Sequence, residues 1–181
     1  YAPDPSSQIA CSIGGNVAEN SGGVHSLKYG LTTNNLLGIE VVTINGDVVR
    51  LGGKHFDSEG YDLLGLITGS EGLLGVVTEV TVRILKKPET ARAVLVGFPS
   101  NEQAGDCVSA IIAAGIIPGG MEMMDKLTTR AVEEFVHAGY NLDAEAILLC
   151  ESDGTEEEVA DEIKRINEIM KKNGAVDIKT S

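Results

Sequence analysis

The sequence is short of basic residues and of long apolar runs, and each shortage excludes a class of protein. Fourteen lysines and arginines stand against 27 aspartates and glutamates, which gives a formal net charge of −13. Binding to nucleic acid or to an anionic membrane surface depends on clustered basic side chains, so neither partner is expected. No apolar run approaches the roughly 20 residues of a membrane-spanning helix, so no membrane span is expected either.

The chain also lacks the spacings typical of metal, thiol and nucleotide sites. Cys11, Cys107 and Cys150 form no Cys-x-x-Cys pair, so neither a zinc site nor a redox dithiol is indicated. Each thiol is expected to serve as a small buried apolar residue, and this use of cysteine favours a cytoplasmic location. His55 and His137 have no other ligand at metal-binding spacing, so no metal site is predicted. The fingerprints Gly-x-x-x-x-Gly-Lys-Ser/Thr and Gly-x-Gly-x-x-Gly are absent, which argues against an NAD-binding Rossmann domain.

The composition of the chain changes near residue 99. Residues 1–99 hold 15 of the 22 glycines, with ten acidic against seven basic residues. Residues 100–181 hold the other seven glycines, with seventeen acidic against seven basic residues. The first part is typical of loops and strands and the second of strands alternating with acidic helices. The proline and charges of residues 86–89 indicate a connection, so a domain boundary is expected there.

The first part contains a strong hairpin signal. Residues 37–44 are rich in β-branched side chains, Asn45-Gly46 follows, and residues 48–51 continue as a second apolar run. Both turn residues tolerate positive φ, so a two-stranded hairpin is predicted. Residues 61–67 are predicted to form a short helix. Residues 76–84 alternate apolar and polar side chains from Val76 onward, so a strand with one buried face is predicted.

The second part is predicted to alternate strands and helices. The expected strands cover residues 94–96, 116–124, 146–150 and 175–179. Ser100 with Gln103 indicates a capping box for a helix over 101–114, and Thr155 with Glu158 indicates another. Asp125 is expected to cap a helix that extends to about residue 138, with apolar residues at helical spacing. The helix after Thr155 carries one apolar stripe. That stripe consists of Val159, Ile163, Ile166 and Met170.

The most informative stretch for chemistry lies in the first 23 residues. Pro3-Asp4-Pro5-Ser6-Ser7 is followed by Ser12-Ile13-Gly14-Gly15-Asn16 and by Asn20-Ser21-Gly22-Gly23. Two Gly-Gly pairs eight residues apart expose backbone N–H groups, and small residues let these groups approach a phosphate. A pair of tight turns in a glycine-rich β-protein would explain the same residues, so both readings stay open at this point.

Read with the segments that follow them, these residues resemble a known family. The run over residues 3–23, then Lys28-Tyr29-Gly30-Leu31-Thr32, then residues 68–85, is similar to the FAD-binding domain of the vanillyl-alcohol-oxidase-type flavoproteins. The resemblance continues through residues 115–125 and 135–140, so it covers essentially the whole chain. Within the family it is strongest to the glycolate-oxidising branch, alongside D-lactate and D-2-hydroxyglutarate dehydrogenases.

The resemblance implies which residues contact the cofactor FAD. Residues 4–6 and 12–15 match a flavin loop at the pyrophosphate and ring. Residues 20–23 match the stretch beside the flavin, and Tyr29-Gly30 matches the Tyr-Gly beneath it. Residues 71–77 match a segment whose main chain contacts the adenosine portion. The residues so assigned are Asp4, Pro5, Ser6, Ser12, Ile13, Gly14, Gly15, Asn16, Asn20, Ser21, Gly22, Gly23, Tyr29, Gly30, Glu71, Gly72, Gly75, Val76 and Val77.

The resemblance also implies an architecture and an activity. The expected fold is α+β, with residues 1–86 as the C-terminal part of a FAD-binding domain. Residues 90–181 would form most of a ferredoxin-like cap, which is the N-terminal part of the substrate domain. The intact protein would oxidise a small 2-hydroxy acid, glycolate or D-lactate, by hydride transfer to flavin N5, and pass electrons to other oxidase subunits.

The same resemblance implies that this chain is a fragment. The family's first pyrophosphate loop would lie before Tyr1, and its histidine-containing catalytic motif after Ser181. No catalytic residue is therefore assigned here, and the chain alone is expected to bind FAD weakly and to be inactive. An interrupted first domain would also leave Ile39, Val41 and Val80 partly uncovered, so a homo-oligomer is expected.

Two alternatives remain open. A ferredoxin-like module with an acidic surface can serve as a non-enzymatic binding or subunit-docking domain, because fold does not determine function. The loops rich in Gly-Gly, Ser and Asn distinguish a docking module from a FAD-dependent enzyme, since a docking module does not need them. His25 lies beside the second Gly-Gly pair, where it is either close to the flavin or a plain loop histidine.

Overall fold

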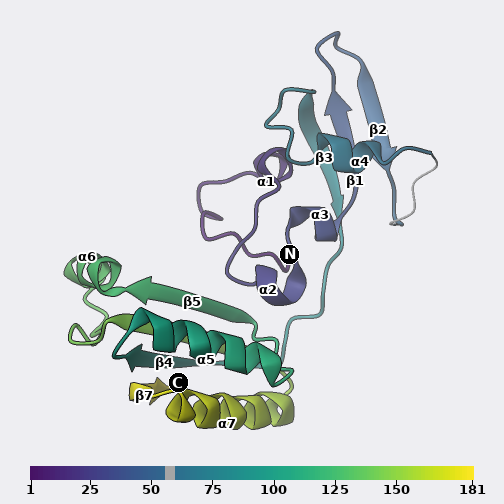
Figure 1. Ribbon diagram of the computed structural model, residues 1–181. Coiled ribbons are helices and arrows are strands. Elements are labelled where there is room, and N and C mark those ends of the chain that lie inside the picture. Colours follow the sequence, from purple (N-terminus) through teal and green to yellow (C-terminus); the bar gives the residue numbers. More distant parts are fainter. Residues whose placement is uncertain (56–59) are drawn as a thin grey trace. The chain divides into compact units, whose positions relative to one another are not determined.

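The computed structural model describes residues 1–55 and 60–181 and divides the chain into two compact units (Figure 1). Unit 1 is Tyr1–Lys86 and unit 2 is Lys87–Ser181. Each unit has one antiparallel sheet with helices, so the predicted α+β class is confirmed. No helix in the described ranges combines the length and apolarity that crossing a bilayer requires.

Unit 1 is a three-stranded sheet with short helices around it. Its elements are α1 (Ile13–Glu19), α2 (Ser26–Tyr29), α3 (Thr32–Asn35), β1 (Leu36–Val42), β2 (Val48–Gly52), α4 (Leu63–Ile67) and β3 (Val76–Val82). The strand order is β2-β1-β3, and the core joins Val17 of α1 to Leu36, Ile39 and Val41 of β1 and to Ile67 of α4.

The hairpin predicted around Asn45-Gly46 is confirmed. β1 and β2 pair antiparallel, with Val42 opposite Val48 at the turn end. Gly46 has φ +83° and donates its N–H to the carbonyl oxygen of Thr43 at 3.0 Å. Positive φ is the conformation that a tight hairpin turn requires of glycine.

The strand predicted over residues 76–84 is confirmed as β3, and Val80 and Val82 lie on the inward face that the alternation indicated, but Val76 at the start of the alternation does not. Val76 is 66% exposed, whereas Val77 and Val80 pack against the core. The register with β1 shifts between Glu40 and Val41, so one additional residue of β3 lies in the ladder there. A β-bulge of this kind moves all side chains beyond it to the opposite face.

Two of the strand residues expected to be partly uncovered are buried. Ile39 and Val41 are 4% and 3% exposed, because α1 and α4 supply cover from within unit 1. Val80 and Val82 of β3 are only partly buried against the same core. The expectation is therefore wrong for Ile39 and Val41, and the oligomeric state stays a prediction.

Unit 2 follows the strand order of a ferredoxin-like sheet. Its elements are β4 (Thr90–Phe98), α5 (Asn101–Ala113), β5 (Gly120–Asp125), α6 (Lys126–Val136), β6 (Ala146–Gly154), α7 (Glu156–Lys172) and β7 (Val176–Thr180). The sheet order is β5-β6-β4-β7, and α5 and α7 lie together on one face (Figure 1). The second predicted strand begins only at Gly120, since Pro118 has no N–H to donate to a ladder.

The predicted helix starts of unit 2 are confirmed at each cap. Ser100 and Asp125 accept the N–H groups of Gln103 and Thr128, at 3.1 and 2.7 Å. Thr155 forms the predicted reciprocal capping box at the start of α7. The predicted apolar stripe of α7 is buried against the sheet and α5.

The apolar residues of α6 do not form its buried face. Leu127 and Phe135 are 75% and 89% exposed, whereas Thr129 is buried and donates its hydroxyl to the carbonyl oxygen of Asp125. Helical spacing therefore predicted the helix but not its orientation, because a side-chain bond to the backbone lets Thr129 occupy the inward side.

The three cysteines are expected to differ sharply in reactivity. Burial raises the pKa of the Cys107 thiol to about 11 and that of Cys150 to about 12, whereas Cys11 is half-buried. Since the thiolate is the reactive form, iodoacetamide at pH 8 should label Cys11 and spare the other two. Mass spectrometry of the labelled peptides measures this, and labelling in denaturant is the control. Equal labelling of Cys107 and Cys11 in the folded chain would contradict the assigned burial.

Candidate functional site

The segment with the first Gly-Gly pair forms a helix and not a tight turn. Ser12 caps α1, because its hydroxyl accepts the N–H of Gly15 at 3.0 Å. Gly14 lies so close to β3 that an added Cβ would be 3.0 Å from the carbonyl oxygen of Val77. Two segments assigned to FAD, around residues 12–16 and 75–77, are thereby packed against each other.

Residues 69–71 dock at the C-terminal end of α1. Gly69 and Glu71 donate their N–H groups to the carbonyl oxygens of Val17 and Ala18, both at 2.8 Å. Asn20, which ends α1, and Glu71 both have positive φ, of 50° and 56°. The predicted site residues of the Glu-Gly segment and of the 20–23 segment thus meet at one end of one helix.

The Asp-Pro segment packs directly against the second Gly-Gly pair. A Cβ on Gly23 would lie 2.1 Å from the carbonyl oxygens of both Pro3 and Asp4, so the two backbones are in direct contact. The carboxylate of Asp4 lies 3.5 Å from Nδ1 of His25. His25, which follows the second Gly-Gly pair, therefore has a partner in the Asp-Pro segment.

Backbone strain is concentrated in these segments. Asp4, Asn20 and Glu71 are non-glycine residues with positive φ, and all three were assigned to FAD from the sequence. Such conformations cost of order 1 kcal/mol or more each and cluster at functional sites. Asn20 has this conformation as the C-cap of α1, where αL backbone is common, and His137 and Asp177 of unit 2 also have positive φ.

The predicted site residues differ in how accessible they are. Pro5 and Asn16 are buried, so their side chains serve packing. The remaining predicted residues are half-buried or exposed, and the exposed ones offer hydroxyl, N–H and apolar groups to a ligand. The exposed ones are Ser6, Ser12, Ile13, Gly15, Glu71, Gly72 and Val76.

The glycines divide into those that the fold itself requires and those that leave space. An added Cβ at Gly22 would meet Ser26 Oγ and Leu31 Cδ2 at 2.7 Å, and Gly23 is blocked by backbone. At Gly15 it would meet only Ser12 Oγ, at 3.2 Å, and at Gly72 nothing within 4 Å. None of the four paired glycines has positive φ, so a left-handed backbone is not what these positions require.

The donor set therefore fits a dinucleotide held by backbone and hydroxyl groups. Ser6 and Ser12 are exposed and carry hydroxyls, and Ile13 offers apolar surface at 42% exposure. Uncharged donors of this kind bind a pyrophosphate when several N–H groups converge on it. No set of three His, Cys, Asp or Glu side chains within residues 1–55 and 60–181 could hold a metal ion.

Two residues that the sequence did not single out organise these segments. Thr32 and Asn35 of α3 are both 0% exposed, and their side chains bond to backbone groups of residues 21, 29 and 31. No sequence signal indicates them, since Thr-Thr-Asn-Asn has no apolar periodicity and the bonded partners lie up to 11 residues away.

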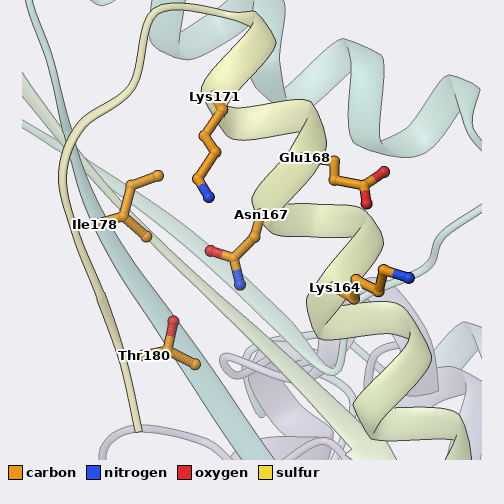
Figure 2. Close-up of a pocket in the computed structure, with 6 residues that line it drawn as sticks. All are labelled: Lys164, Asn167, Glu168, Lys171, Ile178 and Thr180. Atoms are coloured by element: carbon orange, nitrogen blue, oxygen red, sulfur yellow. The ribbon is translucent and has the colours of Figure 1, made fainter.

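Unit 2 has a groove between α7 and β7, separate from the predicted site residues. It has a volume of about 470 Å³ and is lined by Lys164, Asn167, Glu168, Lys171, Ile178 and Thr180. Asn167 and Lys171 point from the helix toward the strand (Figure 2). Its lining carries both signs of charge and no residue assigned to the cofactor.

Both parts of the chain match families of FAD proteins. Residues 1–52 match the family described as FAD binding domain, and residues 87–181 match FAD linked oxidases, C-terminal domain. Glycolate oxidase subunit GlcD of Escherichia coli K12 is 64% identical over 99% of this chain and 36% of its own length. GlcD of Bacillus subtilis is 46% identical over 100% of this chain and 39% of its own length. D-lactate dehydrogenase of Anaerostipes hadrus is 33% identical over 98% and 39%.

Solved structures share the fold at low sequence identity. Alkyldihydroxyacetonephosphate synthase has a TM-score of 0.78 and 22% identity over 97% of this chain and 35% of that chain. p-Cresol methylhydroxylase has a TM-score of 0.72 and 22% identity over 94% and 38%. The chain thus spans little more than a third of the proteins that it matches. The resemblance to the vanillyl-alcohol-oxidase type is confirmed, and the chain belongs to the FAD-linked oxidases, whose cofactor is FAD.

Proposed function

We propose that this chain forms part of the FAD site and part of the substrate domain of a 2-hydroxy-acid oxidoreductase. The observation that carries the proposal is the 64% identity to a glycolate oxidase subunit across 99% of the chain. Similarity to a D-lactate dehydrogenase supports D-lactate, beside glycolate, as a candidate substrate. Residues 1–86 would belong to the FAD-binding domain and residues 90–181 to the substrate domain.

The residues proposed to contact FAD would meet different parts of the cofactor, and the structure supports this assignment. Ser6, Ser12 and the N–H groups near Gly15 would bind the pyrophosphate, where the surface is open. Glu71 and Gly72 would meet the adenosine portion through their backbone. Tyr29, with Gly30, would pack against the flavin, and the remaining residues assigned from the sequence would hold these groups in place. No residue of the chain is proposed as the catalytic base.

When bound, FAD would accept a hydride from the substrate carbon, and the chain's own residues would position the cofactor and exclude water from it. Electron transfer to other oxidase subunits, a homo-oligomeric assembly and a cytoplasmic location belong to the same proposal. A non-enzymatic docking module is not favoured, because both units match FAD-linked families.

A chimaera tests the activity. Its host is the E. coli relative, with the matching 36% of that protein replaced by this chain. The chimaera should bind FAD, and anaerobic glycolate or D-lactate should bleach the flavin absorbance, as in the unmodified E. coli protein. A chimaera that binds FAD but is reduced by neither acid would contradict the proposed substrate class.

The isolated chain is expected to bind FAD more weakly than the chimaera. The relatives are almost three times its length, so residues outside the match would share in holding the cofactor. Titration of each protein with FAD, followed by flavin fluorescence, gives the two dissociation constants. Equal low-micromolar binding by both would show that this chain contains the complete site.

A further inference from the structure

The short helix α3 contains two buried polar side chains that no ligand contact explains. Thr32 and Asn35 are 0% exposed, although α3 is only four residues long and Thr33 and Asn34 beside them are exposed. A polar group is costly to bury unless its hydrogen bonds are made within the protein. The partners of these two side chains therefore indicate what they are for.

Asn35 holds the turn at Gly30. Its Nδ2 donates to the carbonyl oxygens of Tyr29 and Leu31, both at 2.9 Å, so the amide bridges the residues on either side of a glycine with φ +80°. Its Oδ1 accepts from Nη2 of Arg83 at 3.3 Å, and its carbonyl oxygen accepts the N–H of Arg83 at 2.7 Å. Asn35 thus holds this turn with its two amide donors and links it to Arg83, directly after β3, through its two acceptor oxygens.

Thr32 holds the segment that contains the second Gly-Gly pair. Its hydroxyl donates to the carbonyl oxygen of Ser21 at 2.7 Å and accepts from the hydroxyl of Tyr1 at 3.0 Å. Its N–H donates to the same Ser21 oxygen at 3.1 Å. The N–H of Thr33 adds a bond to Oδ1 of Asn20 at 3.0 Å. The start of α3 therefore sets the position of residues 20–21.

We propose that Thr32 and Asn35 are positioning residues, which hold the 20–23 segment and the Tyr29-Gly30 turn in one fixed arrangement for FAD. The inference rests on the proposed function, in which both segments face the cofactor. Neither side chain needs to touch FAD, because each acts through the backbone that it holds. Buried side chains that bond to the backbone fix such a site more rigidly than loop contacts alone.

Asn35→Asp is the sharpest test because it keeps the size of the side chain and removes both N–H donors. The carbonyl oxygens of Tyr29 and Leu31 would then face a carboxylate, and the turn should open. The matched control is Asn34→Asp, where Oδ1 accepts the N–H of Leu31 at 2.9 Å and a carboxylate oxygen can still accept. In the full chain, amide exchange at residues 29–31 should rise about tenfold or more in Asn35→Asp and stay unchanged in Asn34→Asp.

Thr32 offers a second pair of variants with an internal rescue. Thr32→Val keeps the shape and removes the hydroxyl, so exchange at residues 21–23 should rise. Thr32→Ser restores the hydroxyl and should return the exchange toward the wild-type rate. Rescue by serine would show that the bond to Ser21, and not the filled volume, is what matters.

The cofactor test uses the E. coli chimaera. Asn35→Asp and Thr32→Val should each weaken FAD binding by about tenfold or more and alter the visible spectrum of the bound flavin, while Asn34→Asp and Thr32→Ser should do neither. FAD affinity and spectrum equal to wild type in Asn35→Asp would overturn the inference while leaving the proposed function intact. A wild-type chimaera without FAD binding would instead overturn the proposed function, and with it the claim that these residues position a cofactor.

Discussion

Gly23→Ala is expected to unfold unit 1 of this chain. The added Cβ would lie 2.1 Å from the carbonyl oxygens of both Pro3 and Asp4. Both obstacles are backbone atoms, so neither can rotate away as a side chain would. Forcing even one methylene into a packed site commonly costs about 1–3 kcal/mol, and simultaneous overlap with two fixed backbone oxygens lies well above that range. A small domain has only about 5–15 kcal/mol of stability to lose.

The loss should be confined to unit 1. Two-dimensional NMR should show the resonances of residues 1–86 collapse, while those of residues 87–181 persist, because unit 2 has its own core. Gly53→Ala is the control, since an added Cβ there meets nothing within 4 Å. Gly22→Ala should lie between the two, because its obstacles are the side chains of Ser26 and Leu31. A Gly23→Ala chain with wild-type unit 1 resonances would show that Pro3 and Asp4 do not pack there.

Features set by neighbouring residues could be predicted from the sequence. The Asn45-Gly46 hairpin and the capped helix α7 depend on turn and cap chemistry within a few residues, and both are confirmed. The apolar stripe of α7 is long enough for the helical period to identify its buried face.

Features set by distant contacts could not be predicted in the same way. The inward position of Val77 in place of Val76 depends on a bulge opposite Glu40, which alternation along β3 itself does not reveal. The role of Thr32 depends on Ser21 and Tyr1, and that of Asn35 on Arg83, 48 residues away. The outward orientation of Phe135 depends on Thr129 filling the inward side of α6.

The candidate site likewise combines features that could be predicted from the sequence with features that could not. Its segments could be found by resemblance because they are glycine-rich motifs in a fixed order. Which glycines serve the fold and which leave room for a ligand could not, because that depends on what lies within 4 Å of each. Gly23 is occupied by the backbone of residues 3–4, whereas Gly15, in an identical Gly-Gly pair, is open.

At Gly15, substitution by alanine is expected to have opposite effects on the stability of the fold and on the binding of the cofactor. It lies inside α1, its φ is not positive, and an added Cβ meets only Ser12 Oγ at 3.2 Å. Alanine is favoured over glycine inside a helix by about 0.5–1 kcal/mol, so Gly15→Ala should leave the melting temperature of the chain unchanged or slightly raised. The N–H of Gly15 is donated to Ser12 Oγ, so the expected effect on the cofactor is steric: if the pyrophosphate lies against Cα of Gly15, the methyl group should displace it.

In the E. coli chimaera, Gly15→Ala should therefore weaken FAD binding about a hundredfold, equivalent to about 2.8 kcal/mol, without a loss of apo stability. Gly105→Ala in α5 is the matched control, since it is also a helical glycine with open space for a Cβ but lies in unit 2. It should raise stability by a similar small amount and leave FAD affinity unchanged. The comparison separates the two explanations because a turn or packing role predicts lower stability with unchanged affinity, the reverse of what a cofactor contact predicts. Wild-type FAD affinity in Gly15→Ala would remove this glycine, and the open end of α1 around it, from the cofactor site.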